Sequence, residues 1–189
     1  MLYGFELFRS GELPPTSGYS GPGTYTAEPM EPVRWLTTDE QQTWRAFLRG
    51  SRLLLDRLDA DLFAEFGLTL ADYEILVRLS ETRGGLRMTE LAEQALVSRS
   101  RLTYRVDRLV AEGLVDRRPC PSDRRGSLAV LTAAGRRRLE RAAPVHVDGV
   151  LAYLIDQCSP RDLAAIGRVF GAMVAALDSP DDEPTSPRQ

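Results

Sequence analysis

The sequence predicts a mainly helical protein that carries one small β-hairpin, an α+β fold. Three observations support this prediction. Apolar residues recur every three to four positions over most of the chain, which is the spacing of one face of an α-helix. One stretch, residues 114–132, instead places two short apolar runs around a tip rich in Pro, Ser, Asp, Arg and Gly. The 189 residues are enough for one sizeable core with additional tails.

The two ends of the chain are predicted to be disordered, because residues 1–32 and 179–189 are rich in Gly, Pro, Ser and Thr or in charge and show no periodicity. Between them, the first helix is expected from about Thr38 to Phe66. Thr37–Glu40 matches a capping box, and Gly67 is suited to end the helix. The apolar stripe of this helix is longer than the core of a small domain can cover.

The next segments are predicted to be short. A second helix is expected from Thr69, its cap, to Glu81, and Arg83–Gly85 ends it. Leu86–Met88 is too short to pack alone, so we interpret it as a lone edge strand. Thr89 is expected to cap a short third helix.

A helix-turn-helix pattern follows. After the short helix, Leu96 and Val97 are expected to form a tight turn, and Ser98 caps a fourth helix that ends at Gly113. One side of this fourth helix is apolar, and the other side is polar and cationic. The residues of that side that we expect to contact bases or phosphates are Ser98, Arg99, Ser100, Arg101, Thr103, Tyr104 and Arg105.

The predicted hairpin comes directly after the helix-turn-helix and carries Arg124 and Arg125 at its tip. This order of elements defines a winged helix. The major groove of DNA admits one α-helix, whose side chains can read the base edges there. The minor groove is narrow and strongly negative in A·T-rich DNA, so an inserted arginine is stabilised. We therefore expect double-stranded DNA to be the partner of the tip arginines.

The distribution of charge supports this expectation. The whole chain has a net charge of −3. Residues 98–141 contain twelve arginines against five acidic residues, a net charge of +7. A steep asymmetry of this kind, located on the predicted recognition helix and hairpin, favours a polyanionic partner.

The last part of the chain is predicted to be helical. Thr132 caps a helix that extends to about Cys158, and Pro144 is expected to kink or interrupt it. Ser159–Asp162 then opens a nearly all-apolar final helix. Because this helix and the first one exceed what one core can cover, we expect a homodimer. Residues 33–66 and 132–178 would form the helical dimerisation region, and residues 67–131 the winged helix-turn-helix DNA-binding domain.

Residues 91–135 resemble the multiple antibiotic resistance regulator (MarR) family of bacterial transcription factors. The motif that carries the resemblance is met by Asp123, Arg125, Gly126, Leu131, Thr132 and Gly135. The resemblance implies a dimer that reads a palindromic operator, with Arg125 in the minor groove, Asp123 as its salt-bridge partner and Arg124 on a phosphate. It further implies a repressor more often than an activator. It also implies release by a small aromatic or phenolic effector, for which Trp44, Phe47 and Tyr73 are candidate pocket residues.

Two alternatives stay open: a winged-helix interaction module without DNA binding, and a redox-sensing regulator that uses Cys120, which could be exposed in the wing. We do not expect an enzyme, a metal site or a cofactor, because the chain has no P-loop and its single histidine, His146, has no obvious partner. No apolar run approaches the ~20 residues of a membrane span. Together with the resemblance to bacterial transcription factors, this implies a cytoplasmic, nucleoid-associated bacterial protein.

Overall fold

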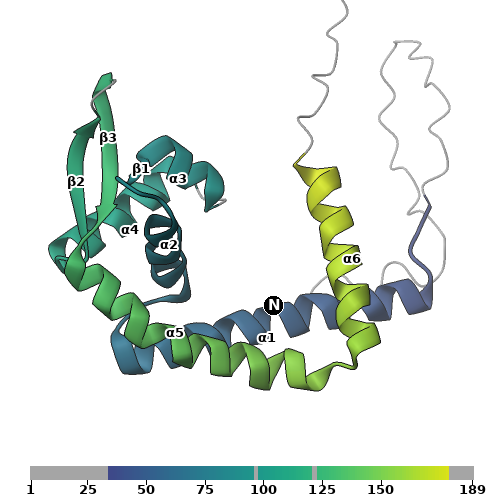
Figure 1. Cartoon of the computed structure of the whole chain (residues 1–189). Helices are drawn as coiled ribbons and strands as arrows, with labels where there is room; N and C mark the ends of the chain where they lie inside the picture. Colours follow the sequence, from purple (N-terminus) through teal and green to yellow (C-terminus); the bar gives the residue numbers. More distant parts are fainter. Residues whose placement is uncertain (1–33, 96–97, 121–122, 179–189) are drawn as a thin grey trace, which may run out of the picture. The chain divides into compact units, whose positions relative to one another are not determined.

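The computed structural model describes residues 34–95, 98–120 and 123–178, with the side chains of 123–125 left undescribed. The predicted disordered ends and the predicted turn at Leu96 and Val97 lie outside the described residues. All described helices and strands belong to the unit that begins at Thr38. They are, in order, α1 (Thr38–Phe66), α2 (Leu70–Glu81), β1 (Leu86–Arg87), α3 (Met88–Gln94), α4 (Arg99–Ala111), β2 (Val115–Cys120), β3 (Asp123–Leu131), α5 (Ala133–Tyr153), the 3-10 turn η1 (Ile155–Gln157) and α6 (Pro160–Leu177) (Figure 1).

Most helix starts follow the predicted capping chemistry. The hydroxyl of Thr69 accepts a hydrogen bond from the backbone of Asp72, and Ser159 forms the same box with Asp162. The Asp162 carboxylate accepts two hydrogen bonds from Ser159, one from its hydroxyl and one from its backbone N–H. These two hydrogen bonds lower the pKa of Asp162. Ser98 caps α4, and Gly113 ends it with a positive φ of 71°. These predictions are confirmed. Each cap depends on a residue only three positions away, and the end of α4 depends on a single glycine.

Three predicted boundaries are wrong. The third helix begins at Met88 and not after Thr89, because Glu90 accepts a hydrogen bond from the backbone N–H of Arg87, at 3.2 Å. The interruption expected at Pro144 is absent, and α5 runs through it, with Ala142 and Gly149 buried on either side. The lost backbone hydrogen bond is thus outweighed by packing on both sides of the proline. Beyond Tyr153, η1 replaces the expected end of the helix.

The three strands form one antiparallel sheet in the order β1-β3-β2. Val115 pairs with Leu131 at the base of the hairpin, and Arg117 pairs with Ala129 further along. The predicted edge strand is confirmed, because Leu86 of β1 also lies opposite Ala129. The hairpin therefore rises as a wing beside α4, with its base held by a third strand (Figure 1).

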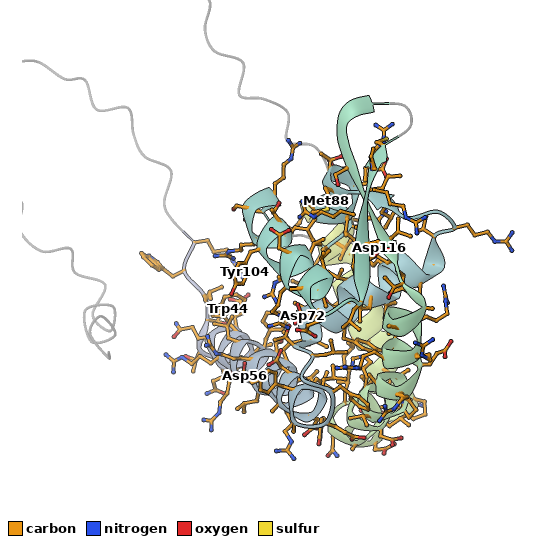
Figure 2. All side chains as sticks on the ribbon, turned by 90° about the vertical axis from the view of Figure 1, so that its left-hand side faces the viewer. Trp44, Asp56, Asp72, Met88, Tyr104 and Asp116 are labelled. Atoms are coloured by element: carbon orange, nitrogen blue, oxygen red, sulfur yellow. The ribbon has the colours of Figure 1, made fainter. Side chains whose placement is uncertain are left out.

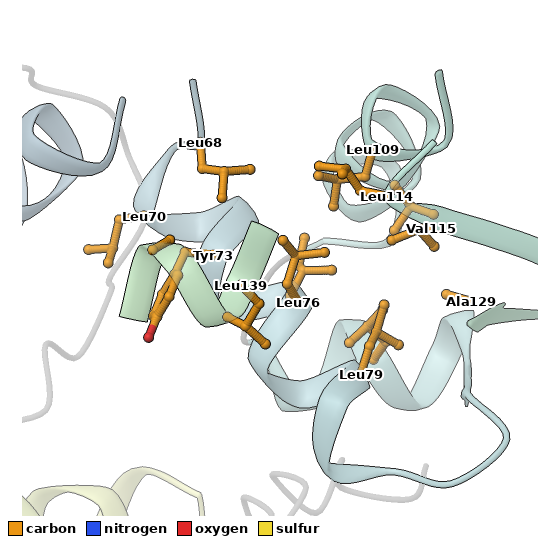
Figure 3. Packing of buried hydrophobic residues seen from close by; sticks show 14 of the residues in the cluster. Leu68, Leu70, Tyr73, Leu76, Leu79, Leu109, Leu114, Val115, Ala129 and Leu139 are labelled. Carbon is orange, nitrogen blue, oxygen red and sulfur yellow. The ribbon is translucent and has the colours of Figure 1, made fainter. Parts of the chain in front are cut away.

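The hydrophobic core supports α4 from behind. Leu62, Leu76, Leu102 and Leu109 are fully buried and bring together α1, α2 and α4. Val115 and Ala129 extend this cluster to the sheet (Figure 3). Each of the buried Leu and Val side chains contributes about 1.5–3 kcal/mol on burial. The apolar side of α4 is thus fixed, and its polar side is left outward.

The base of the wing is joined tightly to the start of α5. The Thr132 hydroxyl caps α5 by accepting from the backbone N–H of Gly135, at 2.9 Å, and it donates to the carbonyls of Gly113 and Leu114, at 2.8 and 3.1 Å. A Cβ atom on Gly135 would lie 2.1 Å from the carbonyl oxygen of Leu114. Thr132 and Gly135 therefore allow the backbone at the base of the hairpin to approach the first turn of α5 closely. We call the contact of Thr132 and Gly135 with Gly113 and Leu114 the wing–α5 joint.

Replacing Gly135 with alanine is expected to lower the free energy of unfolding by about 1–3 kcal/mol, because the added methyl group forces the joint apart. Gly167→Ala in α6 is the matched control, since a Cβ there meets open space. Urea denaturation of both variants measures the difference. Equal midpoints would show that the joint tolerates a side chain.

Candidate nucleic-acid interface

The outward side of α4 and its cap presents polar and cationic side chains together. Leu102, Val106 and Leu109 point into the core, which turns the intervening positions to solvent. Tyr104, labelled in Figure 2, is the large hydrophobic residue of α4 that is exposed, at 74%. Six of the seven predicted contact residues are exposed, and we call them the recognition face: Ser98, Arg99, Ser100, Arg101, Thr103 and Tyr104.

Hydrogen bonds within α4 order part of this recognition face. The Ser98 and Ser100 hydroxyl groups lie 3.2 Å apart, and the Thr103 hydroxyl donates to the carbonyl of Arg99, at 2.8 Å. Among the described residues, Arg99 and Arg101 form no ion pair. Both guanidinium groups are therefore available to bases or phosphates, which they can bind as two-pronged donors.

Arg105, the seventh predicted residue, points elsewhere. Its guanidinium donates to the Thr69 hydroxyl, at 3.2 Å, and lies 3.6 Å from a carboxylate oxygen of Asp72. Arg108 donates to the other oxygen of the same carboxylate and also lies 3.7 Å from Glu112. The structure therefore groups Arg105 with Arg108 on the inner side of α4, apart from the recognition face.

Asp72 supports the site from the core, a role that the sequence analysis did not predict. Its side chain, labelled in Figure 2, is 0% exposed. It accepts a hydrogen bond from the backbone N–H of Thr69, at 3.0 Å, and it forms ion pairs with Arg105 and Arg108. A buried carboxylate is stable only when it is paired in this way. Asp72 thus joins the start of α2 to the middle of α4 and fixes how α4 lies on the core.

The wing adds cationic side chains beside α4. Arg117 of β2 lies 2.9 Å from the carboxylate of Asp107 on α4, and Arg118 lies 3.4 Å from Asp116 on its own strand. The predictions for Asp123, Arg124 and Arg125 concern side chains outside the described residues. Their backbone belongs to β3, at the far end of the hairpin.

The arginine run that opens α5 has a structural partner. Arg138 donates to the backbone carbonyl of Phe66, at 2.5 Å, and so caps the last turn of α1. Arg141 lies over the Phe66 ring, 5.8 Å from its centroid. A cation at a helix C-terminus is favourable, so this contact offsets the cost of positive charge at the start of α5.

The three candidate effector residues fall into two separate clusters. Trp44 and Phe47 stack with ring centroids 5.6 Å apart, and Phe170 of α6 adjoins Phe47. Tyr73 is buried and packs on His146, 4.6 Å away, in the core that also holds Leu62. Burial raises the pKa of Tyr73. Burial also lowers the pKa of His146, and the negative charge of Glu74 partly opposes this lowering. One pocket lined by all three aromatic residues is therefore not formed in the described chain.

Cys120 is the last residue of β2. Cys120 is buried and not exposed, so the expectation of an accessible thiol in the wing is wrong. The register of the hairpin shifts between Pro119 and Cys120, the position at which β2 ends. Within the described residues, no group of three His, Cys, Asp or Glu side chains is placed to hold a metal ion. No helix there is both long and apolar enough to cross a membrane.

The order of α3, α4 and the three-stranded sheet, between long flanking helices, defines a winged-helix protein. The sequence profile of the MarR family matches residues 66–126. The solved structure of AbsC, a MarR family transcriptional regulator from Streptomyces coelicolor, is 42% identical and superposes with a TM-score of 0.73 over 77% of this chain and 98% of its own. The chain belongs to the MarR family.

Two further relatives agree. Sco3205, a MarR family transcriptional regulator from Streptomyces coelicolor solved in complex with DNA, is 40% identical, with a TM-score of 0.75 over 78% of this chain and 97% of its own. The HTH-type transcriptional regulator PecS of Dickeya dadantii is 28% identical over 123 residues, which are 62% of this chain and 74% of PecS. These relatives are regulators, in agreement with the expectation that the chain is not an enzyme.

Proposed function

We propose that this protein is a dimeric, sequence-specific DNA-binding regulator in the bacterial cytoplasm, a repressor that a small molecule releases from its operator. The observation that carries the proposal is the recognition face, whose hydroxyl, phenol and guanidinium groups are turned outward beside a cationic hairpin. Such donors match the base edges of the major groove. The DNA complex of Sco3205, a 40% identical relative, supports the same use of this fold.

A dimer is supported by the apolar surface that α1 and α6 leave uncovered. The 18 residues of α6 include no buried residue, although most of them are apolar or small. An apolar helix of this length is unstable in water without a partner. A second copy would cover it and place two recognition helices about one DNA turn apart, roughly 34 Å.

The proposed effector is a small aromatic or phenolic compound. A groove of about 380 Å³ between α1 and α5 has an apolar wall that includes Leu53 and Leu54, with Arg57 and Tyr153 at its polar side. Its volume suits such a ligand. An effector acts only if it favours one spacing of the two recognition helices over another. Release of bound DNA on addition of salicylate, as the aromatic probe, tests this part.

Gel retardation with the DNA upstream of the protein's own gene tests DNA binding. We expect a specific shifted band, and the logarithm of affinity should fall steeply with the logarithm of salt concentration, by about 0.9 for each phosphate contact. Absence of any shift, together with normal folding, would favour an interaction module without DNA binding.

Replacing Arg125 with alanine is expected to weaken operator binding by roughly 1–3 kcal/mol, because the wing loses its proposed minor-groove arginine. Dimerisation should not change. Arg52→Ala removes the same charge from an exposed position on α1 and serves as the control. Fluorescence anisotropy with labelled operator measures both. If the two variants bind equally well, the wing does not use Arg125.

A further inference from the structure

The contact between Arg117 and Asp107 joins the wing to α4. Arg117 follows the buried Val115 by two positions in β2 and therefore shares the sheet face that packs on α4. Its guanidinium lies 2.9 Å from the Asp107 carboxylate. It also points a second, longer donor contact at the backbone carbonyl of Thr103, one turn back along α4, at 3.5 Å.

Asp107 is unfavourably placed except for this contact. It lies just before the last turn of α4, a helix whose exposed side is cationic. It also lies within the most cationic segment of the chain, whose proposed ligand is a polyanion. Its side chain is 59% exposed, so it carries no part of the core. The ion pair with Arg117 is the interaction that accounts for a carboxylate here.

The ion pair adds little to stability, because an accessible pair of this kind is worth about 0–1 kcal/mol. Its geometric effect is larger, since it is a side-chain link from the outer part of α4 to the strand that leads to the wing tip. The position of α4 relative to the hairpin decides whether both can enter neighbouring grooves at once.

We propose that Arg117 and Asp107 are positioning residues for DNA binding, which hold the recognition helix and the wing at the separation the DNA requires. This inference rests on the proposed function. Arg117 acts through Asp107 and makes no phosphate contact of its own. The contrasting assignment, in which Arg117 is one more phosphate ligand, makes different predictions.

The neutral variant Asp107→Asn separates these assignments by the sign of its effect. If charge alone mattered, removal of a carboxylate near DNA would strengthen binding. Under the positioning role, Asp107→Asn weakens operator binding by roughly fivefold or more, within the range of coupling for residues in contact. Arg117→Gln weakens it by a similar factor and leaves the slope of log affinity against log salt unchanged. If Arg117 of each subunit instead contacted a phosphate, the dimeric variant would lose two contacts, and the slope would fall by about 1.8, which is about 0.9 for each contact.

The experiment uses the full-length protein and the operator fragment that the unmodified protein binds. The exchanged pair, Arg117→Asp with Asp107→Arg, should regain most of the lost affinity. Arg118→Gln is the control, because it removes a positive charge from the same strand. The partner of Arg118 is Asp116, which lies on β2 and not on α4. Circular dichroism checks that each variant is folded.

The outcomes distinguish the two proposals. An Asp107→Asn variant that binds as tightly as the unmodified protein or more tightly would overturn the positioning role, as would an Arg117→Gln variant with a reduced salt slope. If the unmodified protein binds no double-stranded DNA, the proposed function fails and this inference fails with it.

Discussion

Replacing Asp72 with alanine is expected to lower the free energy of unfolding by about 3–5 kcal/mol, the largest single effect on stability that the structure indicates. The carboxylate is fully buried and faces Arg105 and Arg108, whose side chains are each 34% exposed. Its removal leaves the Arg105 guanidinium against the core without its counter-charge, and it leaves Arg108 with Glu112 alone. It also removes the side chain that accepts from the backbone N–H of Thr69.

Two comparisons make this prediction specific. Asp116→Ala, the matched control, removes a half-exposed carboxylate that pairs with Arg118, and we expect a change within about 0.5 kcal/mol. Asp72→Asn keeps an acceptor for Thr69 but loses the charge, so it separates the cap from the ion pairs. Urea denaturation followed by circular dichroism gives the midpoints. A midpoint for Asp72→Ala equal to that of Asp116→Ala would show that the buried pairs contribute nothing net.

Replacing Phe170 with aspartate is expected to convert the proposed dimer into monomers. The Phe170 side chain is 42% exposed, and its ring centroid lies 5.6 Å from that of Phe47. It belongs to an apolar stripe of α6 that continues through Met173, Val174 and Leu177. A carboxylate in the centre of this surface would be left without water or a partner when two copies associate, which costs more than the contact gains.

Sedimentation velocity over a range of concentrations measures the change. Arg168→Asp is the control, because two positions along a helix turn the side chain by roughly 200°, away from the stripe. Since no residue of α6 is buried in the single chain, the core of the variant should remain folded. A Phe170→Asp protein that still sediments as a dimer would place the interface elsewhere. A monomer should also show about half the salt dependence of DNA binding.

Local chemistry explains why much of the fold could be predicted from the sequence. Ser98 and Thr132 cap their helices through hydrogen bonds to backbone groups three residues away, and such patterns are visible in the chain itself. The apolar periodicity of α4 likewise separates the buried Leu102 and Leu109 from the recognition face. Both the order of elements and the outward side of the helix follow from spacing alone.

Contacts between distant residues could not be predicted in this way. Arg105 looked equivalent to Arg101, yet its partner Asp72 and the cap Thr69 belong to a helix about 36 positions earlier. Arg138 meets the carbonyl of Phe66 across 72 positions. The interruption expected at Pro144 is wrong for a different reason, because burial of the flanking Ala142 and Gly149 outweighs a local preference.

The wing–α5 joint has a mechanical consequence. No side chain fits between Gly135 and the carbonyl of Leu114. We therefore expect the hairpin and the first turn of α5 to move together as one rigid unit. The C-terminal end of α5 leads through η1 into α6, the helix proposed to form the dimer interface. If the proposed effector tilts α5 in each subunit of the proposed dimer, both wings would therefore change position, although the effector contacts neither of them.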